Sequence, residues 1–225
     1  MTAIDIAVAT DFADRGVAVR LGIVTAAVAV APAGPALAAA LDEVVAGLPA
    51  RLAGAPVSQV PAVAATRHAY RALGKDPARY RPAAEALMRR VAQGKGLYRV
   101  NNVVDVNNLL SLETGFSIGT YDLDRLAPPL RFRRAGAGET YAGIGRGPLN
   151  LEGLPVFADD RGPFGSPTSD SERTMVTAAA RRVLMVVVGF GGAGGLAPAL
   201  AADLDRAVAV AEALLAAHCA GPAGA

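Results

Sequence analysis

The chain has 225 residues, 52% of them hydrophobic and 19% charged, with a formal net charge of +2. This composition excludes an intrinsically disordered chain, and so small a net charge gives no argument for a polyanionic partner. One cysteine and two histidines exclude a disulfide framework and argue against a metal centre, so we expect no metal and no cofactor.

The N-terminal part of the chain predicts strands followed by helices. Residues 4–9 alternate in polarity as a strand does, and residues 17–30, rich in Val and Ile, predict one or two further strands. A one-sided stripe of Leu and Val predicts a helix over 35–48, and Pro61 starts a second helix that ends before Gly74.

Two more helices are predicted over 82–93 and 102–113, with Asn102 as the cap of the second. Short apolar runs separated by Gly, Pro and Asp then predict β-strands across 116–188, and a last helix is predicted over 196–217. No linker rich in Pro, Gly or Ser divides the chain, so we expect one compact α+β unit.

Residues 183–202 hold no charge, but five glycines between positions 189 and 195 interrupt the run. We therefore expect a buried strand, a tight turn and a helix rather than a membrane span, and a cytoplasmic protein. The same glycines match part of a dinucleotide-binding fingerprint. That function stays open as a weaker alternative, although no second strand is predicted after the helix.

Positive charge is concentrated in residues 67–99, which hold nine basic and two acidic residues. Arginines spaced along helices can share a face, so this segment could contact the phosphates of RNA, or it could be an ordinary solvated surface. The candidates for RNA binding are Arg71, Arg79, Arg81, Arg89, Arg90 and Lys95.

Two segments carry more polar groups than a core requires. Around the start of the helix over 102–113, Asn101, Asp105 and Asn108 fall close to one face, which either holds neighbouring backbone or meets a polar ligand. The loop over 164–174 contains several hydroxyl groups, two carboxylates and Arg173. Turn formation alone does not require so many donors and acceptors, and the pattern favours a binding loop.

Residues 100–126 resemble the start of the B3/B4 domain of the phenylalanyl-tRNA synthetase β subunit. The shared features are an N-N-V-V-D-x-x-N helix, then L-E-x-G, then a turn of the pattern F-D-x-D, which is Tyr-Asp-Leu-Asp here from Tyr121. Gly138-Glu139 and the apolar strand over 156–159 extend the likeness.

The resemblance implies an α+β fold of three layers, in which a β-sandwich core is flanked by helices. We assign this B3/B4-like domain to residues 65–225, with the strands and helix of residues 1–64 packed on the same unit. The sequence contains no ATP-binding catalytic motif, so we do not expect a complete aminoacyl-tRNA synthetase.

In the synthetase this domain hydrolyses tRNA esterified with the wrong amino acid. The resemblance therefore implies a freestanding editing domain that deacylates misacylated tRNA in trans. The alternative is a module that binds tRNA, or an amino-acid-like ligand, without turnover. The family's histidine falls at Gly119 here, so specificity for a tyrosyl ester is not implied.

The resemblance leaves the catalytic residue unidentified. Ester hydrolysis requires only an oriented water and stabilisation of the developing oxyanion, and neither of these requires a catalytic triad. The candidates for the substrate pocket are Asn101, Asp105, Asn108, Thr120 and Asp122 on one side, and Thr168, Ser169, Asp170 and Glu172 on the other.

Overall fold

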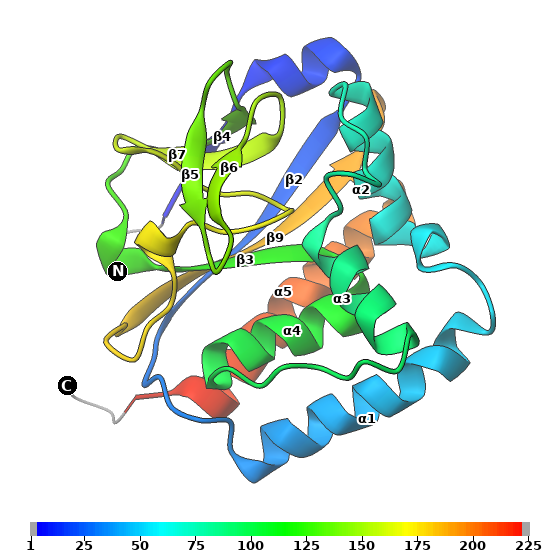
Figure 1. The fold of residues 1–225 in the computed structure, drawn as a ribbon, viewed down its shortest axis with the longest axis vertical. Helices are drawn as coiled ribbons and strands as arrows, with labels where there is room; N and C mark the ends of the chain where they lie inside the picture. The colour runs from blue at the N-terminus through cyan, green and yellow to red at the C-terminus, as the bar shows by residue number, and fades with distance from the viewer. Residues whose placement is uncertain (1–3, 222–225) are drawn as a thin grey trace.

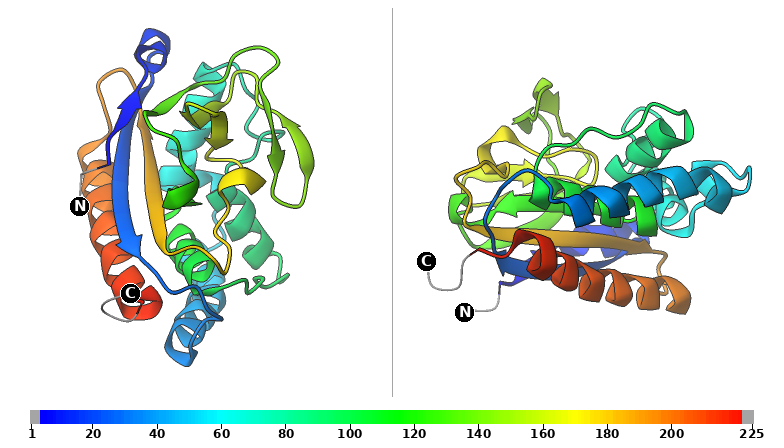
Figure 2. Two further views of the ribbon diagram at one scale, coloured as in Figure 1. Left: turned by 90° about the vertical axis from the view of Figure 1, so that its left-hand side faces the viewer. Right: turned by 90° about the horizontal axis from the view of Figure 1, so that it is seen from below.

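The computed structural model describes residues 4–221 and has three layers (Figure 1). Two β-sheets lie face to face, and helices cover the outer face of one of them (Figure 2). This arrangement confirms the expected α+β architecture, a β-sandwich core flanked by helices.

The central sheet has the strand order β2-β9-β3 and is antiparallel. It consists of β2 (Ala18–Ala27), β9 (Arg182–Gly191) and β3 (Ser117–Asp122). β2 pairs with β9 along its whole length, and β3 pairs with the opposite edge of β9. Both faces of β9 are covered by other layers, which explains its unbroken run of Val, Leu and Met.

None of the helices within residues 4–221 has the length and apolar character needed to cross a membrane.

The second sheet has the order β1-β4-β7-β8, in which only the β1–β4 pair is parallel. Its strands are β1 (Ile6–Val8), β4 (Leu130–Arg134), β7 (Pro155–Asp159) and β8 (Gly162–Gly165). Aromatic side chains fill the space between the sheets, and the ring centroids of Phe132 and Phe157 are 4.5 Å apart. A separate hairpin, β5 (Thr140–Gly143) and β6 (Gly147–Asn150), stands beside this sheet.

Two long helices cover the other face of the central sheet: α4 (Asn102–Thr114) and α5 (Pro198–Cys219). Leu109 of α4 and Leu204 of α5 belong to the same buried cluster as Met185 and Val187 of β9. The remaining helices pack around α4 and the end of β9; they are α1 (Pro35–Leu52), α2 (Pro61–Ala72) and α3 (Ala83–Ala92).

Short 3₁₀ helices join several elements: η1 (Thr10–Arg15), η2 (Val57–Gln59), η3 (Leu123–Arg125) and η4 (Glu172–Thr174). The helix predicted over 35–48 continues to Leu52, because Leu48 is buried in a cluster with Met88 and Leu112 that holds its last turn in place. The first two strands belong to different sheets: β1 pairs with β4 in the second sheet, and β2 pairs with β9 in the central sheet.

The start of α4 differs from the sequence prediction. Asn101, not Asn102, is the N-cap, and its side chain accepts a hydrogen bond from the backbone N–H of Val104 at 2.9 Å. Asn102 is buried and donates to the backbone carbonyls of Ala29 and His218, at 2.9 Å each. Its amide therefore ties α4 to two distant segments of backbone, which is one of the two roles considered for the polar residues of this helix.

Candidate active site

A cleft of about 110 Å³ lies where α4 and β3 meet the segment that follows β8. The residues that line it come from α4, β3, the β5–β6 turn and residues 170–176; they are Val104, Asn107, Thr120, Ile144, Asp170, Met175 and Val176. The two polar segments singled out in the sequence, the asparagine-bearing helix and the hydroxyl-rich loop, therefore border one cleft.

One wall of the cleft is formed by α4 and the strand that follows it. Gly115, with φ of 76°, ends α4 and allows the sharp turn into β3. Thr120 of β3 then faces back towards the helix, and its hydroxyl donates to Oδ1 of Asn107 at 2.9 Å. The cleft thus presents a hydroxyl and an amide that hold each other in place.

Asp170 provides the carboxylate of the cleft. Its Oδ1 accepts a hydrogen bond from the hydroxyl of Tyr121 at 3.0 Å, and its backbone carbonyl accepts from the N–H of Ile144 at 3.1 Å. Burial raises the pKa of Asp170 to about 7, although the Tyr121 hydrogen bond acts in the opposite direction. Burial also raises the pKa of Tyr121 well above its ordinary value, so the phenol keeps its proton and acts as the donor.

The other predicted loop residues are used to build the loop itself. The hydroxyl of Thr168 lies 2.8 Å from that of Tyr70, and the hydroxyl of Tyr141 donates to the backbone carbonyl of Ser169 at 2.7 Å. Ser166 accepts from the backbone N–H groups of Thr168 and Ser169. Thr168 and Ser169 are therefore not among the residues that line the cleft, because they secure the turn that carries Asp170.

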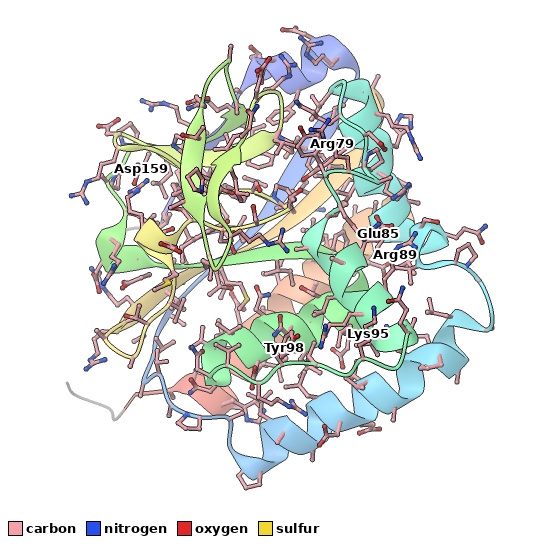
Figure 3. The ribbon with its side chains drawn as sticks, in the orientation of Figure 1. Arg79, Glu85, Arg89, Lys95, Tyr98 and Asp159 are labelled. Carbon is pink, nitrogen blue, oxygen red and sulfur yellow. The ribbon has the colours of Figure 1, made fainter. Side chains whose placement is uncertain are left out.

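Glu172 and its neighbour Arg173 also lie outside the cleft lining. Glu172 is exposed on η4, whereas Arg173 forms a two-pronged ion pair with Asp159, with both N–O distances 2.9 Å. Burial opposes ionisation of Asp159, but the hydrogen bonds from Arg173 and from two backbone N–H groups outweigh it and lower the pKa of this carboxyl. Asp159, labelled in Figure 3, thus anchors the loop to the end of β7.

Four of the predicted residues on the α4 and β3 side have other positions. Asn101 caps α4, and Asn108 is half-buried outside the cleft lining. Asp105 is fully buried and accepts from the backbone N–H of Val100 at 3.1 Å; desolvation raises the pKa of its carboxyl. Asp122 caps η3 and lies 3.3 Å from the guanidinium of Arg125.

The residue of α4 that the sequence prediction missed is Asn107. It shares a helix face with Val104, three residues earlier, whereas the predicted set follows the face of 101, 105 and 108. Polar and apolar residues are interspersed around α4, so the sequence offered no clear stripe to show which face meets β3.

The basic segment is less available for RNA than its charge suggests. Arg67 and Arg89 both pair with the buried carboxylate of Glu85, at 2.9 and 2.8 Å, and Arg89 and Glu85 lie together on α3 in Figure 3. Arg90 stacks on the exposed ring of Tyr98, with the guanidinium 4.0 Å from the ring centroid. The exposed candidates are Arg71, Arg79, Arg81 and Lys95.

Two glycines of the run over 189–195, both at the end of β9, have a packing explanation. A Cβ atom at Gly189 would lie 2.5 Å from Leu204, and one at Gly191 would lie 2.3 Å from the carbonyl oxygen of Gly195. Through residue 221, no strand follows α5, so the described chain lacks the βαβ unit of a dinucleotide site.

Over the same described range, no group of three or more His, Cys, Asp or Glu side chains is placed to hold a metal.

Comparison with protein families identifies the domain that contains this cleft. The model of the B3/4 domain matches residues 65–195, more than half of the chain, which include every residue that lines the cleft. The chain belongs to the B3/4 domain family. This membership confirms the resemblance stated from residues 100–126.

The relatives of this B3/4 domain chain include a tRNA ligase subunit. The phenylalanine–tRNA ligase beta subunit of Leifsonia xyli subsp. xyli (strain CTCB07) is 35% identical to it over 98 residues, which are 42% of this chain and 12% of that protein. An N-terminal fragment of the phenylalanyl-tRNA synthetase beta subunit from Pyrococcus horikoshii aligns with a TM-score of 0.37 and 20% identity, over 48% of this chain and 39% of the fragment. The B3/4 domain chain thus spans a small part of its curated relative's length.

Proposed function

We propose that this B3/4 domain protein hydrolyses the ester bond of misacylated aminoacyl-tRNA in trans. The observation that carries the proposal is the cleft itself, in which the carboxyl of Asp170, with its pKa at about 7, shares a small space with Thr120 and Asn107. A general base works best when its pKa is close to the working pH, because it is then both ionised and basic enough to take a proton.

The proposed reaction needs no group beyond these side chains and water. A water oxygen bonds to the ester carbonyl carbon while one of its protons passes to Asp170. The Asn107 amide N–H groups can donate to the oxyanion that develops on the carbonyl oxygen, while the Thr120 hydroxyl, which donates to Asn107 Oδ1, holds that amide in place. The bond between that carbon and the ribose oxygen then breaks, and the proton on Asp170 passes to the ribose oxygen. The products are the free amino acid and uncharged tRNA.

Family membership supports tRNA as the partner, since the curated relative is a tRNA ligase subunit. We propose that the exposed Arg71, Arg79, Arg81 and Lys95 contact its phosphates, and that the protein acts in the cytoplasm, where aminoacyl-tRNA is made and used. The ion pair of Arg67 with Glu85 joins α2 to α3, and Arg89 pairs with the same carboxylate from within α3.

The direct test is to incubate the purified protein with a panel of mischarged tRNAs and to measure the loss of ester. We expect hydrolysis of at least one member and a loss of at least a hundredfold in rate for Asp170→Asn. The matched control is Asp160→Asn, which alters an exposed carboxylate on the β7–β8 turn, outside the cleft lining. Intact tRNA binding with no ester loss across the panel would instead support the alternative, a binding module without turnover.

A further inference from the structure

The ring of Tyr121 lies between two glycines that belong to different sheets. A Cβ atom built at Gly119 of β3 would lie 2.1 Å from the phenolic oxygen, and one built at Gly165 of β8 would lie 2.3 Å from the same atom. Real Cβ atoms do not approach other atoms so closely. With Tyr121 in this position, both sites must therefore be glycine, and the phenol occupies the space that their side chains would otherwise fill.

The surroundings of the ring keep it in this position. Tyr121 is fully buried, and it meets the rings of Phe157 and Phe164 edge-on, with centroids 5.7 and 4.8 Å away. Its hydroxyl donates to Asp170 Oδ1 at 3.0 Å. Because Asp170 lines the cleft, the phenol fills the volume directly behind this wall and holds the carboxylate against the cleft.

The remaining volume limits what can bind. The cleft measures about 110 Å³, whereas a dry cavity of about 150 Å³ is the size that takes up benzene. The cleft is partly open to solvent, and the space that it encloses beside Asp170 is smaller than an aromatic ring needs but sufficient for a side chain of one or two non-hydrogen atoms. Apolar contacts are available from Val104, Met175 and Val176, and polar ones from Thr120 and Asn107.

We infer that Tyr121 sets the substrate range of this cleft, which takes aminoacyl esters with small side chains, of the size of glycine, alanine or serine, and excludes aromatic ones. The inference rests on the proposed function for the identity of the ligand as an aminoacyl ester. Tyr121 is thereby assigned as a specificity-determining residue. Its ring occupies the space that side chains at positions 119 and 165 would fill, and it does not contact the reacting atoms.

Binding of analogues that cannot be hydrolysed separates this inference from the proposed reaction. We would measure, by calorimetry, the affinity of adenosine carrying an alanyl or a tyrosyl group through a 3′-amide. We expect the alanyl analogue to bind the parent protein at least tenfold more tightly than the tyrosyl analogue. Such a preference without any ester hydrolysis would overturn the proposed reaction and leave the inference standing. Equal affinities, a tyrosyl preference or binding of neither would overturn the inference.

Two variants then test whether Tyr121 is the cause. Tyr121→Val shortens the side chain, and we expect the alanyl-to-tyrosyl affinity ratio to fall at least fivefold as the cleft extends into the vacated space. Tyr121→Phe keeps the ring, and we expect the ratio to stay within twofold of the parent. An unchanged ratio in folded Tyr121→Val would contradict the assignment. Should that variant fail to fold, the comparison in the parent protein still decides the substrate range.

Discussion

The hydroxyl of Tyr121, on β3 of the central sheet, donates a 3.0 Å hydrogen bond to Oδ1 of Asp170, in the loop after β8 of the other sheet. This contact joins the two sheets at the cleft and places a carboxyl group where burial raises its pKa to about 7. The phenols of Tyr121 and Tyr141 are the titratable groups that face Asp170. Neither carries a positive charge that would stabilise the ionised carboxylate.

Stability should therefore depend on pH through Asp170. An aspartate in an unfolded chain has a pKa of about 3.9, so the folded state holds the proton more tightly. The stability that this provides is fully present below about pH 4 and is lost as the pH rises through about 7. Asp170→Asn has no proton to lose and still accepts from Tyr121. From urea unfolding at pH 4 to 8, we expect the parent to lose stability relative to this variant, by a few kcal/mol at most. Parallel pH curves would show that the carboxyl is not perturbed.

The pH dependence of ester hydrolysis offers a second prediction. If Asp170 is the base, kcat/KM rises with pH through an apparent pKa of about 7 and then levels off. Tyr121→Phe removes the hydrogen bond that favours the ionised carboxylate, so the midpoint should move to higher pH. A variant that lowers the rate equally at every pH would indicate that Tyr121 only supports the fold.

Gly119 should tolerate no side chain while Tyr121 is present. We expect Gly119→Ala to lower the free energy of unfolding by about 1–3 kcal/mol, because the added methyl group forces the buried ring out of its position. Gly47 of α1 is the matched control, since a Cβ there meets nothing within 4 Å. Gly47→Ala should raise the stability by up to about 1 kcal/mol. Equal effects of the two substitutions in urea unfolding would contradict the packing around Tyr121.

The pairing of Arg67 with Glu85 predicts a large effect from a single arginine. The carboxylate of Glu85 is completely buried, whereas the side chain of Arg67 is 14% exposed. Arg67→Ala leaves Glu85 with Arg89 alone, and we expect a loss of about 3 kcal/mol. Arg71→Ala, one turn later on α2 and exposed, should change stability by less than about 0.5 kcal/mol. Similar losses in the two variants would show that the buried pair contributes nothing.

Binding of tRNA should depend on salt through the exposed arginines. We expect Arg71→Ala, Arg79→Ala and Arg81→Ala each to weaken binding and to reduce the slope of log K against log salt by up to about one. The control, Arg206→Ala, removes an exposed arginine of α5 that pairs with Asp203. Titrations at several salt concentrations measure the slope, and a slope that none of the three substitutions changes would exclude this surface.

The sequence predicts those parts of the molecule in which the pattern of burial is local. The apolar run of β9 is continuous because both faces of that strand are covered, and the stripe from Leu37 to Leu48 is one-sided because α1 packs on one side only. The motif over 100–126 was sufficient to indicate the family. Of the predicted pocket residues, Thr120 and Asp170 line the cleft beside α4.

The rotation of α4 and the content of the cleft were not predictable in the same way. Asn107 rather than Asn108 lines the cleft because of how α4 packs between the central sheet, α1 and α5. The polar and apolar residues of α4 are interspersed, so its sequence carries no stripe that encodes this rotation. Likewise, Tyr121 meets Gly165 and Asp170 only because β3 and β8 belong to two sheets that face each other. Local sequence indicates the buried side of an element where it carries a one-sided stripe or a continuous apolar run, as in α1 and β9. Which distant side chains share a cavity depends on how the layers pack, and only the tertiary structure decides that.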